Sequence, residues 1–148
     1  MILKITSKFL ILIFIITTNV FAKDGFGDVK FTNQSFQNFL AYLRGDGNPN
    51  ATGVMQTSGK PTGFAINQKG NVTFYYYCPK KYGDNCMPGG HIRAQNDCTK
   101  RSEKRGLGRC FVFAKGRLIK WDSANVKIPK KVTASQVREI FKENGWLD

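Results

Sequence analysis

Beyond residue 30 the chain shows an apolar stripe at helical spacing, followed by a long polar stretch. The stripe falls at positions i, i+3, i+4 and i+7 and comprises Phe36, Phe39, Leu40 and Leu43. This period predicts a helix over about residues 32–43, and Gly45 can end it in a left-handed conformation. Residues 45–63 are rich in Gly, Pro, Asn, Ser and Thr, which predicts a long loop.

Alternation of apolar and polar positions predicts two β-hairpins. The first joins segments 63–67 and 71–78 through a Gln-Lys-Gly turn, and one face of its second strand comprises Val72, Phe74, Tyr76 and Cys78. The second joins segments 110–114 and 117–121 through Lys115 and Gly116, where glycine supplies the positive φ of a tight turn. Residues 126–131 are predicted to be a connector.

Two further helices complete the pattern. One is predicted over residues 91–104, with a thin apolar stripe of Ile92, Ala94 and Cys98. The other begins at Thr133, whose capping box is completed by Gln136, and it ends at Gly145. Its inward-facing residues are Val137, Ile140 and Phe141, and Trp146 can fold back over the last turn. The order α-ββ-α-ββ-α predicts an α+β domain, a small antiparallel sheet of two hairpins with three helices packed on it.

The first 22 residues have the three parts of a secretory signal peptide. Lys4 and Lys8 precede an unbroken run of eight apolar residues, 9–16, and Val20-Phe21-Ala22 ends on a small residue. The run is too short for a membrane span, so no span is expected after cleavage. We expect cleavage after Ala22, a single mature domain over residues 23–148, and a periplasmic or secreted location.

Four cysteines lie in the mature part of the chain. An even count in an exported protein favours two disulfides, and the spacing favours Cys78 with Cys86 and Cys98 with Cys110, although four cysteines allow three connectivities. Gaps of 7, 11 and 11 residues between successive cysteines do not suit zinc, whose ligands come in close pairs. Neither a metal nor a cofactor is expected.

The chain is strongly basic. Its formal net charge of +13 falls to +11 when the two lysines of the signal peptide are removed. This charge fits contact with an anionic polymer or an acidic protein, but a solvated surface with a lysine-rich composition is the simpler explanation. No specific nucleic-acid partner is expected. The densest cluster comprises Lys100, Arg101, Lys104, Arg105 and Arg109, and the adjacent hairpin could extend it with Lys115, Arg117 and Lys120.

Two further features have both a functional and a structural interpretation. His91 is the only histidine, and near Cys86 it could deprotonate a thiol nucleophile, but this requires a free thiol. The run Tyr75-Tyr76-Tyr77 could stack on bases or sugars, or it could pack under helices, as strand aromatics commonly do. The function classes in view are a binding module, a small enzyme that uses His91, and a structural accessory domain of the cell envelope.

Residues 98–121 resemble a module of small exported proteobacterial proteins whose function is undefined. The shared features are a helix cysteine, a second cysteine that opens a strand, a Phe-Ala-x-Gly turn and an Ile-x-Trp strand. Residues 63–78 resemble the preceding hairpin of that module. The resemblance covers about half of the mature chain, and it implies an exported α+β fold without implying an activity.

Overall fold

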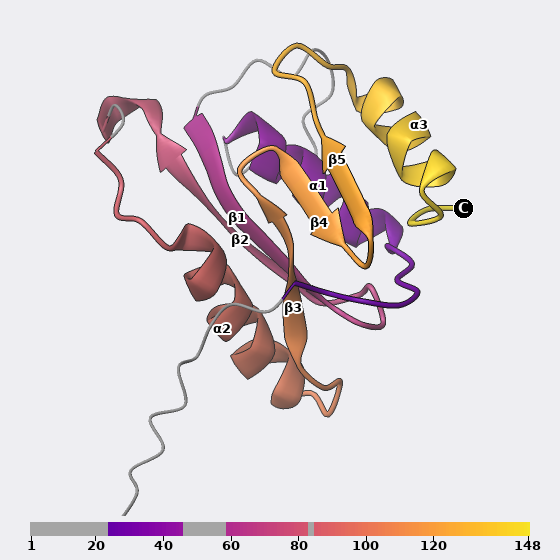
Figure 1. Ribbon diagram of the computed structural model, residues 1–148. Coiled ribbons are helices and arrows are strands. Elements are labelled where there is room, and N and C mark those ends of the chain that lie inside the picture. Colours follow the sequence, from indigo (N-terminus) through magenta and orange to yellow (C-terminus); the bar gives the residue numbers. More distant parts are fainter. Residues whose placement is uncertain (1–23, 46–58, 83–84) are drawn as a thin grey trace, which may run out of the picture.

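The computed structural model of the protein describes residues 24–45, 59–82 and 85–148. In these residues one five-stranded antiparallel sheet carries helices on both faces (Figure 1). Helices α1 (Asn33–Arg44) and α3 (Ala134–Glu143) pack on one face, and α2 (Gly90–Glu103) packs on the other. The α+β class predicted from the sequence is therefore confirmed.

The sheet contains more than the two expected hairpins. Its strand order is β2-β1-β3-β4-β5, and β1 pairs with both β2 and β3. A short 3-10 helix, η1 (Lys80–Tyr82), follows β2. The predicted order α-ββ-α-ββ-α is wrong by one strand, because β5 pairs with β4 after the second hairpin. The strands are β1 (Gly59–Asn67), β2 (Thr73–Pro79), β3 (Cys110–Lys115), β4 (Leu118–Trp121) and β5 (Ala124–Lys127).

Both errors in the predicted strands have local causes. The strand β5 has only four residues, of which Ala124 and Val126 pack against the core. Its alternation of apolar and polar residues is therefore too short to be recognised as a strand in the sequence. Asp122, with a φ of 54°, turns the chain tightly from β4 into β5. At the other end of the sheet, β1 begins four residues earlier than predicted, because an irregularity between Pro61 and Gly63 lets this proline-containing stretch keep its pairing with β2.

The three helices begin and end within two residues of their predicted bounds. The Thr32 side chain accepts a hydrogen bond from the Ser35 amide at the start of α1, and Gly45 ends that helix at a φ of 69°. At the start of α3, Thr133 and Gln136 form the reciprocal capping box. Beyond α3 the chain folds back, and the Trp146 amide donates to the Phe141 carbonyl at 2.9 Å.

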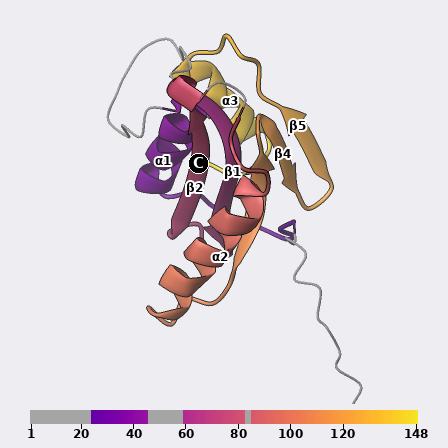
Figure 2. The ribbon, with the colours of Figure 1, turned by 90° about the vertical axis from the view of Figure 1, so that its left-hand side faces the viewer.

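The two faces of the sheet have separate apolar cores. The larger core lies under α1 and α3 and is dominated by aromatic rings, among them Phe31, Phe39, Phe64, Phe113, Phe141 and Trp146. The smaller core lies under α2 and comprises Ala65, Val72, Ala94, Cys98 and Cys110. In the side view of Figure 2, α1 flanks β2 while α2 crosses the lower end of the sheet. The position of α2 is therefore set by a small core of its own.

The first described residues lie along the sheet. The Gly25 amide donates to the Val112 carbonyl at 3.2 Å, and the Gly25 carbonyl accepts from the Asp122 amide at 2.7 Å. A Cβ on Gly25 would lie 2.1 Å from the Trp121 ring, so only glycine fits there. The expected signal peptide and the cleavage site after Ala22 lie outside the described residues. Within the part of the chain that is described, no helix is long and apolar enough to cross a membrane.

Candidate anion-binding site

The C-terminal half of α2 presents cations beside the edge strand β2. On this helix a row of charged residues runs at i, i+3, i+4 and i+7 from Asp97, so its members share one face. This face and one aromatic ring of β2 line a shallow hollow of about 650 Å³. We call the residues that line it the basic hollow: Phe74, Asp97, Lys100, Arg101, Lys104 and Arg105.

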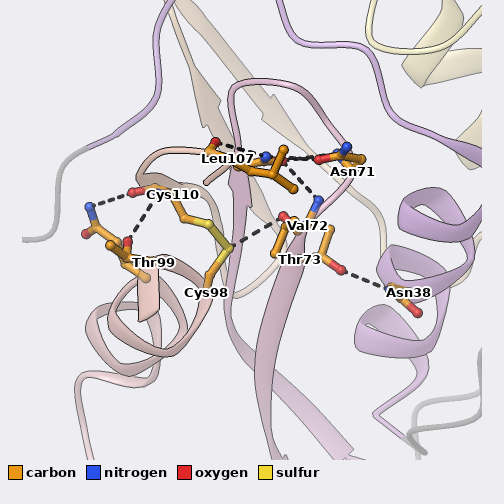
Figure 3. Close-up of a disulfide and its surroundings, with 10 residues drawn as sticks. Asn38, Asn71, Val72, Thr73, Cys98, Thr99, Leu107 and Cys110 are labelled. Atoms are coloured by element: carbon orange, nitrogen blue, oxygen red, sulfur yellow. Dashed lines mark hydrogen bonds between the residues drawn. A yellow bond between two sulfur atoms is a disulfide. The ribbon is translucent and has the colours of Figure 1, made fainter. Parts of the chain in front are cut away.

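A disulfide holds this part of α2 on the sheet. Cys98 is bonded to Cys110 at the start of β3, with 5.7 Å between their Cα atoms. Both cysteines are fully buried. The Cys110 amide also donates to the Thr99 hydroxyl at 3.1 Å, and its carbonyl accepts from the Gln95 amide at 3.1 Å (Figure 3). The helix that carries the cations is thus joined to residue 110 by one covalent bond and two hydrogen bonds.

Arg101 has a defined place on the wall of the hollow. Its guanidinium carbon lies 4.9 Å from the centre of the Phe74 ring, and Phe74 lies 5.5 Å from the ring of Tyr76. An aromatic face attracts a guanidinium and leaves the in-plane N–H groups available to a ligand. Because the ring restricts its motion, Arg101 loses less conformational entropy than a freely rotating side chain when it holds an anion.

The single carboxylate of the hollow has a partner. The Tyr76 hydroxyl donates to Asp97 at 2.5 Å. This hydrogen bond is the main cause of the raised pKa of Tyr76, and burial and the Asp97 charge add to it. Tyr76 therefore stays protonated at neutral pH and keeps the carboxylate directed at the sheet. Four cations and one carboxylate leave the basic hollow with a net positive charge.

The other predicted members of the basic cluster lie elsewhere. Arg109 is exposed in the loop between α2 and β3, and it does not line the hollow. Lys115 forms an ion pair with Asp24 at 3.0 Å. Lys120 lies on β4, a strand that α2 does not cover. The structure thus brings together four of the five cations of the predicted cluster and leaves the second hairpin out.

Arg117 has a structural role that sequence reasoning missed. Its guanidinium donates to the Leu43 carbonyl at 2.9 Å and to the Pro129 carbonyl at 2.7 Å. Burial lowers the pKa of this half-buried group, although Tyr42 beside it acts in the opposite direction. Arg117 therefore joins the end of α1 to the segment before α3 and does not belong to the exposed basic surface.

The three consecutive tyrosines do not form one stacking platform. Tyr75 packs in the larger core, with ring centres 5.9 Å from Phe64 and 6.1 Å from Tyr42. Tyr76 points to the opposite face, toward α2. The aromatic residue that lines the hollow is Phe74, and its placement there was missed. The alternation of β2 puts it on the α2 face, but nothing local in the sequence says which helix covers that face.

His91 lies in a second, smaller hollow of about 280 Å³ at the first turn of α2, together with Lys60, Thr62, Gly116 and the bond between Cys78 and Cys86. Because both cysteines are bonded, His91 has no thiol to deprotonate. Burial is the main cause of its lowered pKa; the Lys115 charge adds to the shift and Asp24 opposes it. His91 is therefore largely uncharged at neutral pH.

Comparison of the chain with protein-family models, with curated proteins and with solved structures finds no match. Among the residues that the structure describes, no group of three or more His, Cys, Asp or Glu side chains could hold a metal ion. The argument for a function therefore rests on the geometry and charge of the basic hollow.

Proposed function

We propose that this protein is an exported, non-enzymatic module that binds an anionic polymer in the basic hollow. The observation that carries the proposal is the row of cations on one face of α2, opposite Phe74. The cations extend over residues 100–105, about 7.5 Å along a helix axis, so the row can meet a series of closely spaced anionic groups. An arginine fixed over an aromatic ring is well suited to a phosphate or carboxylate, because its planar fork binds two oxygens at once.

A polymer suits this site better than a small anion. The hollow is shallow, and the side chains of Lys100, Arg101, Lys104 and Arg105 are exposed, so each cation makes a weak contact in water. Several weak contacts combine when their partners are linked along one chain. An acidic protein is the other class that the charge admits, and the test below separates the two.

The binding test uses inorganic polyphosphate, titrated into the protein by calorimetry in NaCl from 50 to 200 mM. Four cations on a single-stranded polyanion predict a slope of about −3 in a plot of log K against log salt, so affinity should fall about 50-fold over this range. Replacing Lys100, Arg101, Lys104 and Arg105 with Gln should remove most of that slope. The melting temperature should hardly change, since exposed charges contribute little to stability.

The matched control removes four exposed charges from elsewhere: Lys127, Lys130, Lys131 and Lys142 are replaced with Gln. We expect this variant to keep most of the affinity and of the salt slope. If the two quadruple variants lose equal affinity for polyphosphate, the hollow contributes no more than any other exposed charge, and the proposal is wrong. If the wild-type protein does not bind polyphosphate but binds an acidic protein through the same residues, the proposal that the ligand is an anionic polymer is wrong.

Export is proposed on the signal-peptide pattern, and two disulfides fit an oxidising compartment. Mass spectrometry of the protein recovered from the producing cells tests it. The expected mass is that of a chain that begins at Lys23, lowered by four hydrogens for the two bonds. After reduction, alkylation should label four cysteines, and before reduction it should label none. An intact Met1 on exported protein would contradict cleavage and favour a tethered protein.

A further inference from the structure

Three exposed apolar side chains lie within eleven residues of the sequence, on the segment that leads from η1 to the first turn of α2. In the described part of the chain, four large apolar side chains are exposed, and three of them are Tyr82 at 53%, Met87 at 65% and Ile92 at 37%. They lie in η1, in the segment before α2 and in the first turn of α2, along the left side of Figure 1. We call these three residues the apolar tip.

The fold holds the tip outward. Cys86 is bonded to Cys78, whose side chain is 2% exposed at the end of β2, so the chain beyond η1 is tied to the sheet. The Tyr82 carbonyl accepts a hydrogen bond from the Asn85 amide at 3.1 Å. The disulfide therefore fixes Cys86, the neighbour of Met87, beside the end of β2.

Cations surround the apolar tip. The Lys81 ammonium lies 4.8 Å from the centre of the Tyr82 ring, and the Arg93 guanidinium lies 3.9 Å from the Met87 sulfur. Lys80 is exposed in the same short helix. Asp84 is the one acidic residue in the sequence from 78 to 93, so this stretch carries a positive net charge. Apolar side chains flanked by cations are complementary to a bilayer, which has an apolar interior and can carry anionic headgroups.

We propose that the apolar tip docks on an anionic lipid bilayer, with Tyr82, Met87 and Ile92 in the interface and Lys80, Lys81 and Arg93 at the headgroups. Tyrosine favours the membrane interface, since its ring is apolar and its hydroxyl reaches water. Lysine and arginine near an anionic leaflet add attraction to the headgroups. Three side chains are too small a surface for a stable protein interface, which buries about 800 Å² on each partner.

The tip and the basic hollow can be tested separately. They lie at opposite ends of α2, whose 14 residues span about 20 Å. At 150 mM salt, charges more than about 8 Å from a membrane surface are largely screened. A membrane that contacts the tip is therefore attracted mainly by the tip cations, although the hollow contains more charge.

The test is sedimentation of the disulfide-bonded protein, beginning at Lys23 so that the signal peptide is absent, with vesicles in 150 mM NaCl. The vesicles contain either phosphatidylcholine alone or phosphatidylcholine with 30% phosphatidylglycerol. The wild type should sediment with the second set and much less with the first. Tyr82→Ser, Met87→Ser and Ile92→Ser together should lower partitioning by more than about tenfold. Loss of Lys80, Lys81 and Arg93 to Gln should lower it by about fivefold for each cation.

Two controls separate this proposal from the previous one. Phe26→Ser removes the fourth exposed apolar side chain, which is 52% exposed, and should change partitioning by less than about twofold. The quadruple Gln variant of the basic hollow should lose less partitioning than the tip cation variant, although it lacks more charge. The tip serine variant should still bind polyphosphate as the wild type does, which also shows that it is folded.

Insertion has its own readout. A Tyr82→Trp variant should show blue-shifted emission on the anionic vesicles and quenching by brominated lipid, over the constant signal of the buried Trp121 and Trp146. Three results would overturn the proposal. They are a wild type that does not sediment with anionic vesicles, a tip serine variant that sediments like the wild type, and a hollow variant that loses more than the tip cation variant.

Discussion

Replacing Phe39 with alanine is expected to lower the free energy of unfolding by about 3–5 kcal/mol. The side chain is fully buried on α1. Its ring centre lies within 6.4 Å of five other rings, those of Phe31, Tyr42, Phe64, Phe113 and Phe141. Apart from Tyr42 on α1 itself, these rings come from the segment before α1 and from β1, β3 and α3. These parts meet only in the folded state, so none of them can close over the cavity alone.

Urea denaturation measures this loss, followed by the emission of Trp121 and Trp146, which are buried in the same core. The matched control is the same substitution at Phe26, whose side chain is 52% exposed and contacts Phe111 at 5.6 Å. We expect the Phe26→Ala variant to lose less than about 1 kcal/mol. Similar losses in the two variants would contradict the placement of Phe39 at the centre of the core.

Replacing both Cys98 and Cys110 with alanine is expected to destabilise the protein by about 4 kcal/mol. A cross-link between residues 12 apart contributes about 3 kcal/mol by restricting the unfolded chain. The two sulfurs are also fully buried in the small core under α2, so their removal leaves a void that adds about 1 kcal/mol. The hydrogen bonds from Gln95 and to Thr99 use the backbone of residue 110, and they remain in the variant.

The paired variant Cys78→Ala and Cys86→Ala is the control. Its bond joins residues 8 apart and contributes about 2.5 kcal/mol on the same grounds. Cys86 is half-buried, so no comparable void forms. Urea denaturation monitored by circular dichroism compares the two variants. If the Cys78 and Cys86 variant loses more free energy of unfolding, the contribution that we assign to the core under α2 is wrong.

Local chemistry made the helices predictable. The capping box at Thr133 and the stop at Gly45 act through atoms a few residues away, and each appears in the structure where the sequence indicates it. The pairing of β1 with β3 is a different matter. Residues 63–67 and 110–115 are separated by more than forty residues in the sequence. They pair because the backbone N–H and C=O groups of each strand need hydrogen-bond partners, and the sequence of one strand does not show which other strand supplies them.

The candidate site was predictable to the same extent. Helical spacing alone groups Lys100, Arg101 and Lys104, since one helix carries all three. Phe74 joins them because α2 covers β2, a tertiary fact that the alternation of β2 does not contain. Arg117 looks like any surface cation in the sequence. Its hydrogen-bond partners are two backbone carbonyls, which every residue has, so the sequence contains no side chain that would indicate this structural role.

The hydrogen bonds of Gly25 bear on the timing of maturation. With the proposed cleavage after Ala22, the new amino terminus is Lys23, which directly precedes Asp24, and Asp24 pairs with Lys115. A backbone group cannot bond to Val112 and to a peptidase at once. If the chain is cleaved after Ala22, as we propose, the cut therefore comes before the amino-terminal segment pairs beside β3 and β4, and the last step of folding follows it.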